Sequence, residues 1–121
     1  MKRTVEDVLA AVNESVGDTF VEPVTSIRSE RIGGDTALHI VAKWGDAEAV
    51  RLLVKAGATI DKPGEDNNTP LHYAAMLGKL EAAKCLVELG AKPSRDRYGN
   101  TPSQLATDNA VLRSYLLQNG F

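Results

Sequence analysis

The chain has 121 residues, 25% of them charged and 43% apolar, and this length corresponds to one globular domain. The 14 basic and 16 acidic residues nearly cancel, which argues against a broad cationic face for nucleic acid or for a membrane surface. Only 5% of the residues are aromatic, so the core must consist mainly of Ala, Leu and Val. The single cysteine, Cys85, excludes an internal disulfide and fits a reducing compartment.

The N-terminal segment is predicted to form a helix that covers the first unit of the fold. Thr4 and Asp7 resemble a capping box. One apolar face of about three helical turns follows, formed by Val5, Val8, Leu9, Val12 and Val16. Glu6 and Asp7 interrupt any signal-peptide core, and no run of 18 apolar residues occurs, so we expect a cytoplasmic protein without a membrane span.

A long connection separates this helix from the next element. It spans 19 positions from Gly17 to Thr36, against 12 from Gly57 to Thr69. A β-hairpin is predicted here, because several residues favour extended structure, namely Phe20, Val21, Val24 and Ile27.

The remainder of the chain repeats itself. Residues 36–42 (TALHIVA), 69–75 (TPLHYAA) and 101–107 (TPSQLAT) correspond, and the threonines that open them follow one another at an almost constant interval. The run VRLLVKAGA (50–58) likewise matches AKCLVELGA (83–91), and a shorter copy, RSYLLQNG (113–120), follows.

Each copy predicts two short helices. The repeated threonines Thr36, Thr69 and Thr101 are N-cap candidates, and Pro70 and Pro102 suit the first helical position. Glycines then end the helices: Gly45 and Gly78 the first of each pair, Gly57 and Gly90 the second. The second helices show apolar residues at helical spacing, namely Val50, Leu53 and Val54, and Leu80, Leu86 and Val87. Because neither helix of a pair can bury its apolar face alone, the core is expected to be shared between stacked units.

The period of about 33 residues and the TPLHxA motif resemble the ankyrin repeat, over about residues 31–121. The resemblance implies an all-α solenoid of stacked helix-turn-helix units with β-hairpin-like loops. Within a single domain, 1–121, we expect a capping helix and long loop (1–32), two full repeats (33–63 and 64–95) and a shortened capping repeat (96–121). Ala37, Ser103 and Gln104 depart from the motif, and polar residues suit a solvated end, namely Arg113, Ser114, Gln118 and Asn119.

Catalytic and metal sites are weakly indicated. His39 and His72 occupy the same repeat position, and stacking would place them too far apart to share an ion. The resemblance implies instead that each imidazole bridges backbone groups of neighbouring loops. Cys85 lies beside Leu86 without an activating partner, which favours a buried core residue over a nucleophile. Gly33 and Gly34 indicate a turn rather than a phosphate loop, so neither an enzyme nor a bound cofactor is expected.

The resemblance implies a binding face on the first helices and the loop tips. By register, the helix positions are Lys43 and Trp44, Met76 and Leu77, and Asp108 and Asn109. The loop-tip positions are Ile32, Asp35, Glu65, Asp66, Asn68, Arg97, Tyr98 and Asn100.

A subset of these residues is the predicted protein-binding site. Large apolar side chains that the scaffold does not need for packing suggest anchors at Trp44, Met76, Leu77 and Tyr98. Orienting charges are predicted at Lys43, Asp66 and Arg97. Residues 1–68 carry 8 basic and 12 acidic residues, and residues 69–121 carry 6 and 4, which would give the face a dipole. The alternative is that scattered apolar and charged residues are ordinary surface.

These observations favour a non-catalytic module that binds another protein. The alternative is a dedicated enzyme inhibitor or toxin-immunity protein, since the small, capped chain resembles a stand-alone product. Nucleic-acid binding through Arg95 and Arg97 would require a steep salt dependence, and an enzyme would require turnover dependent on Cys85 or His72. A monomer is expected, although two full units plus caps could also pair as a dimer.

Overall fold

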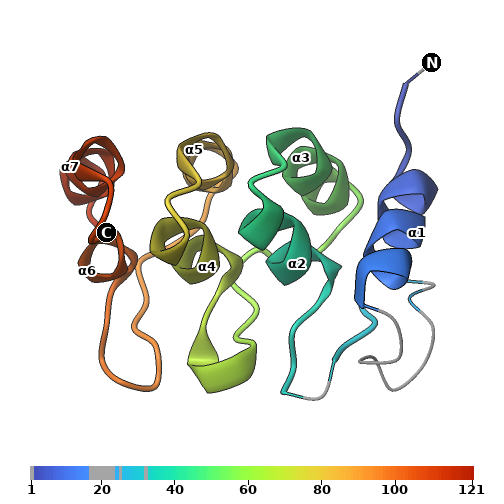
Figure 1. Cartoon of the computed structure of the whole chain (residues 1–121), viewed down its shortest axis with the longest axis horizontal. Coiled ribbons are helices and arrows are strands. Elements are labelled where there is room, and N and C mark those ends of the chain that lie inside the picture. The colour runs from blue at the N-terminus through green and yellow to red at the C-terminus, as the bar shows by residue number, and fades with distance from the viewer. Residues whose placement is uncertain (1, 17–23, 25, 32) are drawn as a thin grey trace.

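The computed structural model describes residues 2–16, 24, 26–31 and 33–121. This part of the chain holds seven α-helices and one 3-10 helix, arranged as a row of helix pairs with the connecting loops on one side (Figure 1). The α-helices are α1 (Val5–Val16), α2 (Ala37–Trp44), α3 (Ala47–Lys55), α4 (Pro70–Met76), α5 (Leu80–Glu88), α6 (Pro102–Leu105) and α7 (Ala110–Gln118), and the 3-10 helix is η2 (Glu65–Asn67). No strand occurs among these residues, so the predicted all-α solenoid is confirmed.

The first helix of each pair begins at its predicted threonine. The hydroxyl oxygen of Thr69 accepts a hydrogen bond from the backbone N–H of His72, and that of Thr101 from the N–H of Gln104, at 3.3 and 3.4 Å. Pro70 and Pro102 are the first residues of α4 and α6, where a missing N–H costs nothing. At the end of α2, Gly45 has a φ of 78°, a left-handed conformation that a residue with a Cβ adopts at a cost.

The core runs continuously from one unit to the next. α2 packs against α3 and α4, α3 packs against α5, and α4 packs against α5 and α6. The fully buried side chains along this row include Leu38, Leu53, Leu71, Leu86, Leu112 and Leu116. Stacking of neighbouring units therefore creates the core, as the repeat pattern predicted.

Helix α1 covers the N-terminal end of the stack. Thr4 and Asp7 form the predicted capping box: the Thr4 N–H donates to the Asp7 carboxylate, and the Asp7 N–H to the Thr4 hydroxyl, at 2.9 and 3.2 Å. Val8 and Val12 are fully buried. Arg3 forms an ion pair of 2.6 Å with Asp46, which joins the start of α1 to the start of α3.

The connection after α1 is described only in part. A β-hairpin was expected here from four residues, and two of them, Phe20 and Val21, lie outside the described residues. Val24 is buried, and Ile27 lies in a turn.

The C-terminal unit is shortened, as predicted. Helix α6 has only four residues, and the hydroxyl of Ser103 donates to the backbone oxygen of Phe121 at 2.6 Å, which holds the last residue against α6. The polar residues expected on the outside of α7 are exposed, namely Arg113, Ser114, Gln118 and Asn119. Val111 and Leu117 are also exposed, so the outer side of α7 is less polar than the sequence pattern predicted.

The loops between units contain the same kind of turn. The N–H of Gly64 donates to the carbonyl of Asn68 at 2.8 Å, and the N–H of Asp96 to that of Asn100 at 2.9 Å. The N–H of Arg97 also donates to the carbonyl of Asp66 at 2.8 Å, which links two successive loops.

Across the described residues, no helix is both long and apolar enough to cross a membrane.

Candidate binding surface

The two histidines stabilise the loops. Nε2 of His39 lies 2.7 and 3.1 Å from the carbonyl oxygens of Lys62 and Asn68, and its Nδ1 accepts from the N–H of Thr36 at 3.0 Å. Nε2 of His72 contacts the carbonyl of Asn100 at 3.0 Å in the same way. Burial lowers the pKa of both imidazoles, which favours the neutral ring that donates through Nε2. The expected bridging role is therefore confirmed.

Cys85 is a core residue, as predicted. Its side chain is buried, and its Sγ lies 3.6 Å from the carbonyl oxygen of Ala47. Burial raises the pKa of the thiol, which disfavours the nucleophilic thiolate. Within the described part of the chain, no three His, Cys, Asp or Glu side chains gather in a way that could hold a metal ion.

The large apolar residues at the ends of the first helices are exposed. Trp44 is 39% exposed, Met76 43% and Leu77 50%. Trp44 and Leu77 are separated by one repeat period, so they occupy the same position in consecutive units. The expectation that the scaffold does not bury these side chains is confirmed.

A depression of about 390 Å³ lies beside Met76 and Leu77. Asp108 and Asn109 of the C-terminal unit line its other side. They were predicted on the first helix of that unit, which was wrong, because α6 already ends at Leu105 and both residues lie in the turn before α7. The Asn109 side chain is already used, because it accepts a hydrogen bond from the N–H of Leu112 at 3.0 Å and caps α7. Asp108 is exposed and supplies a carboxylate next to the apolar side chains.

Lys43 is the orienting charge closest to Trp44, and it is partly engaged within the protein. Its Nζ lies 3.4 Å from the buried carboxylate of Asp35 and 4.1 Å from the centre of the Tyr73 ring. The Tyr73 hydroxyl donates to Asp35 at 3.1 Å. The pKa of that hydroxyl is raised, mainly because it is buried and secondly because of the negative charge of Asp35. The charge of Lys43 is therefore partly neutralised within the protein.

The loop tips present one exposed aromatic ring and one ion pair. Tyr98 is 69% exposed. Arg97 pairs with Asp66 at 3.5 Å, so the two predicted orienting charges partly neutralise each other. Both side chains remain accessible.

Two residues expected at the loop tips are buried instead. Asp35 is 2% exposed and accepts from the N–H of Glu65 and the hydroxyl of Tyr73, at 3.0 and 3.1 Å. Asn68 is 7% exposed because it immediately precedes the cap of α4. The prediction of surface positions was wrong for both, since the repeat register does not show which way a loop residue turns. Ile32 lies outside the described residues.

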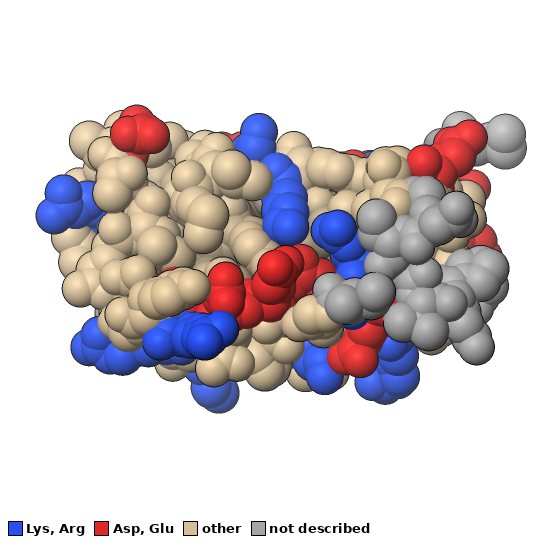
Figure 2. Space-filling model, turned by 60° about the horizontal axis from the view of Figure 1, so that its bottom comes forward, with Lys and Arg blue, Asp and Glu red and all other residues tan. Residues whose placement is uncertain are grey.

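Charged side chains gather on the loop face. Figure 2 shows acidic side chains near the middle of this face, with basic side chains beside them both towards the C-terminal unit and on the opposite side. The predicted dipole along the face is therefore only partial. Val111 and Leu117 of α7 are 65% and 58% exposed, whereas the sequence pattern predicted a polar outer side for this helix.

Comparison with known proteins identifies the family. A comparison with curated proteins finds no matching sequence. A family model described as ankyrin repeats, in three copies, matches residues 8–97 and 60–121. The match begins within α1, earlier than the resemblance near residue 31, and spans most of the chain. Together with the stacked helix pairs and the loop-bridging histidines, this match shows that the chain belongs to the ankyrin repeat family.

Proposed function

We propose that this protein is a non-catalytic module that binds a partner protein through the surface formed by Trp44, Met76, Leu77 and Tyr98. Ankyrin repeats are generally protein-interaction modules and typically non-catalytic. The observation that carries the proposal is the exposure of Trp44 and Leu77, 39% and 50%, at matching positions of consecutive units, with the exposed Met76 next to Leu77. Aromatic and other large apolar groups of this kind are the usual anchors of protein interfaces.

The rim of this surface suits orientation more than affinity. Asp108 lines the depression beside Met76 and Leu77, and the Arg97–Asp66 pair lies at the loop tips that also carry Tyr98. Such rim charges guide encounter and exclude wrong partners, while the buried apolar contact supplies most of the binding energy. A prefolded stack also loses little conformational entropy on binding, which favours a rigid module.

Truncation of the anchors tests the proposal. Proteins captured from the native host by the wild-type chain would be identified, and the affinity of each would be measured by calorimetry. Trp44→Ala or Leu77→Ala is expected to weaken binding by about 2 kcal/mol or more, about thirtyfold. Both variants should keep the far-ultraviolet circular dichroism and the melting temperature of the parent.

Leu117→Ala is the matched control, because Leu117 is 58% exposed on α7 and does not line the depression beside Met76 and Leu77. Its affinity should equal that of the parent. Equal affinity in all three variants would reject the surface. The alternative function, a dedicated inhibitor, requires in addition that the captured partner lose its own activity in the complex.

A further inference from the structure

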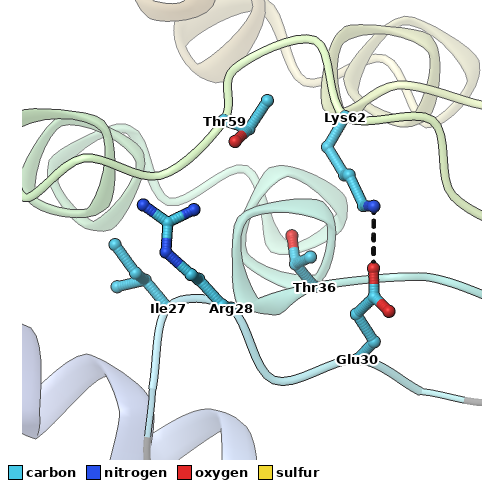
Figure 3. Close-up of a pocket in the computed structure, with 6 residues that line it drawn as sticks. All are labelled: Ile27, Arg28, Glu30, Thr36, Thr59 and Lys62. Carbon is cyan, nitrogen blue, oxygen red and sulfur yellow. Dashed lines mark ion pairs between the residues drawn. The ribbon is translucent and has the colours of Figure 1, made fainter.

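A second recessed site lies away from the proposed surface, between the connection that precedes α2 and the loop that follows α3. The pocket holds about 260 Å³, smaller than the roughly 300–1,000 Å³ typical of sites that enclose a whole small molecule. Figure 3 shows its lining residues, which are Ile27, Arg28, Glu30, Thr36, Thr59 and Lys62.

The equivalent junction one unit further along contains a carboxylate. There, Asp61 accepts a hydrogen bond from the backbone N–H of Lys92, with both carboxylate oxygens 3.2 Å from the nitrogen. Arg28 precedes Asp61 by one repeat period, and Thr59 precedes Lys92 by the same interval. The first junction therefore has the same loop N–H as the second, but a cation in place of the carboxylate.

The two junctions are also built alike. The Cδ1 atom of Ile27 lies 3.9 Å from the place of a Cβ on Gly57, so the connection is packed against the loop that carries Thr59. Ile60 precedes Asp61 just as Ile27 precedes Arg28. The change from Asp61 to Arg28 is therefore a change of side chain within a frame that this molecule repeats.

Two polar groups that line the pocket, on Arg28 and Thr59, have no partner among the described residues. Lys62 pairs with Glu30 at 2.9 Å, and the Thr36 hydroxyl lies 3.0 Å from Nδ1 of His39. Among the described residues, the Arg28 guanidinium has no carboxylate within 4.0 Å, and the Thr59 N–H has no acceptor. In Figure 3, the guanidinium of Arg28 and the hydroxyl of Thr59 approach the same space.

We propose that this pocket binds a carboxylate group, supplied either by an acidic side chain of a polypeptide or by a free small carboxylate ion. The bound carboxylate takes the role that Asp61 has at the next junction. It accepts from the N–H and hydroxyl of Thr59 and forms a charge-assisted pair with the guanidinium of Arg28. The site shares no residue with the surface around Trp44, so the two proposals can fail independently.

Titration of the ¹⁵N-labelled protein, followed by nuclear magnetic resonance at constant ionic strength, tests the site. The probe is the blocked peptide acetyl-Ala-Glu-Ala-amide, and its glutamine counterpart is the control ligand. The amide signal of Thr59 should shift saturably with the glutamate peptide and stay unchanged with the glutamine peptide. Sodium acetate forms a parallel arm: tighter binding of the peptide identifies an acidic side chain, and binding of acetate at least as tight identifies a free carboxylate.

Substitutions at the cation complete the test. Arg28→Gln should raise the dissociation constant at least about tenfold, since a charge-assisted hydrogen bond is lost. Arg113→Gln, which removes an exposed arginine from α7, should leave it unchanged. Arg28→Asp should abolish binding, because the new carboxylate can itself accept from Thr59. The proposal is overturned if no ligand shifts the Thr59 signal saturably, or if Arg28→Gln binds like the parent.

Discussion

At the scale of single residues, the least expected feature is the burial of Asp35. Its carboxylate accepts from the N–H of Glu65 and from the hydroxyl of Tyr73, and Lys43 balances its charge at 3.4 Å. A buried carboxylate is tolerated only when hydrogen bonds and a counter-charge replace its hydration. The partners come from three separate segments, so Asp35 joins the first loop to the next one and to α4.

Gly64 makes room for this carboxylate. Its φ of −102° suits any residue, but a Cβ there would overlap the Asp35 carboxylate and lie 2.8 Å from Nε2 of His39. Gly64→Ala should therefore lower the free energy of unfolding by about 2–3 kcal/mol, because the network must shift or break. Urea denaturation followed by circular dichroism measures the change.

Gly99→Ala is the control that measures backbone strain without a steric clash. Gly99 has a φ of 83° and no atom within 4 Å of an added Cβ, so only conformational strain remains. A loss of about 1 kcal/mol is expected from that strain. If Gly64→Ala cost no more than Gly99→Ala, the Asp35 network would have to be loosely packed, contrary to the contacts described above.

At the scale of elements, the helix starts could be predicted from the sequence and the loop interiors could not. A threonine followed by proline specifies its helix start through local contacts, so α4 and α6 begin where the motif predicts. The direction of Asp35 depends instead on Gly64 and Tyr73, which lie in the next loop and in the first helix of the next unit. The proposed binding surface shows the same division. The exposure of Trp44 could be predicted from the repeat register, whereas the partial neutralisation of Lys43 depends on its contacts with Asp35 and with Tyr73 of the next unit.

The start of α3 shows how one side chain can serve two elements. Asp46 accepts from the N–H of Ala49 at 3.0 Å and pairs with Arg3 at 2.6 Å, so it caps α3 and fixes the beginning of α1. Asp46→Ala should lower the free energy of unfolding by about 1–2 kcal/mol, chiefly through the lost cap. Asp46→Asn keeps a cap and loses only a partly exposed ion pair, so about 0.5 kcal/mol is expected.

Glu48→Gln serves as the comparison in the same thermal or urea measurements. Glu48 approaches Arg3 at 3.6 Å but its side chain is 63% exposed, so its removal should have almost no effect. Equal losses for the alanine and asparagine variants of Asp46 would show that the ion pair, and not the cap, stabilises this junction.

At the scale of the whole molecule, each unit has at most two neighbours. The units around α2 and α4 are packed on both sides, whereas α1 and α7 each lie at an end of the row (Figure 1). In such a stack, stability is approximately the sum of the units and of the interfaces between neighbours. The proposed binding surface spans the central units and the beginning of the C-terminal one, so its geometry depends on the interface between α4 and α6.

This arrangement predicts that core substitutions act locally at the end of the stack and globally in its middle. Leu116 of α7 and Leu71 of α4 are both buried, and truncation of a buried leucine costs about 2–5 kcal/mol. Leu116→Ala should accelerate native-state hydrogen exchange of α6 and α7 amides at least about tenfold, and those of α2 and α3 less than about threefold. Leu71→Ala should accelerate exchange in every helix from α2 to α7, because α4 contacts both neighbouring units. Uniform acceleration by Leu116→Ala would mean that the molecule opens only as one unit, and the binding surface would then be as stable as the entire fold.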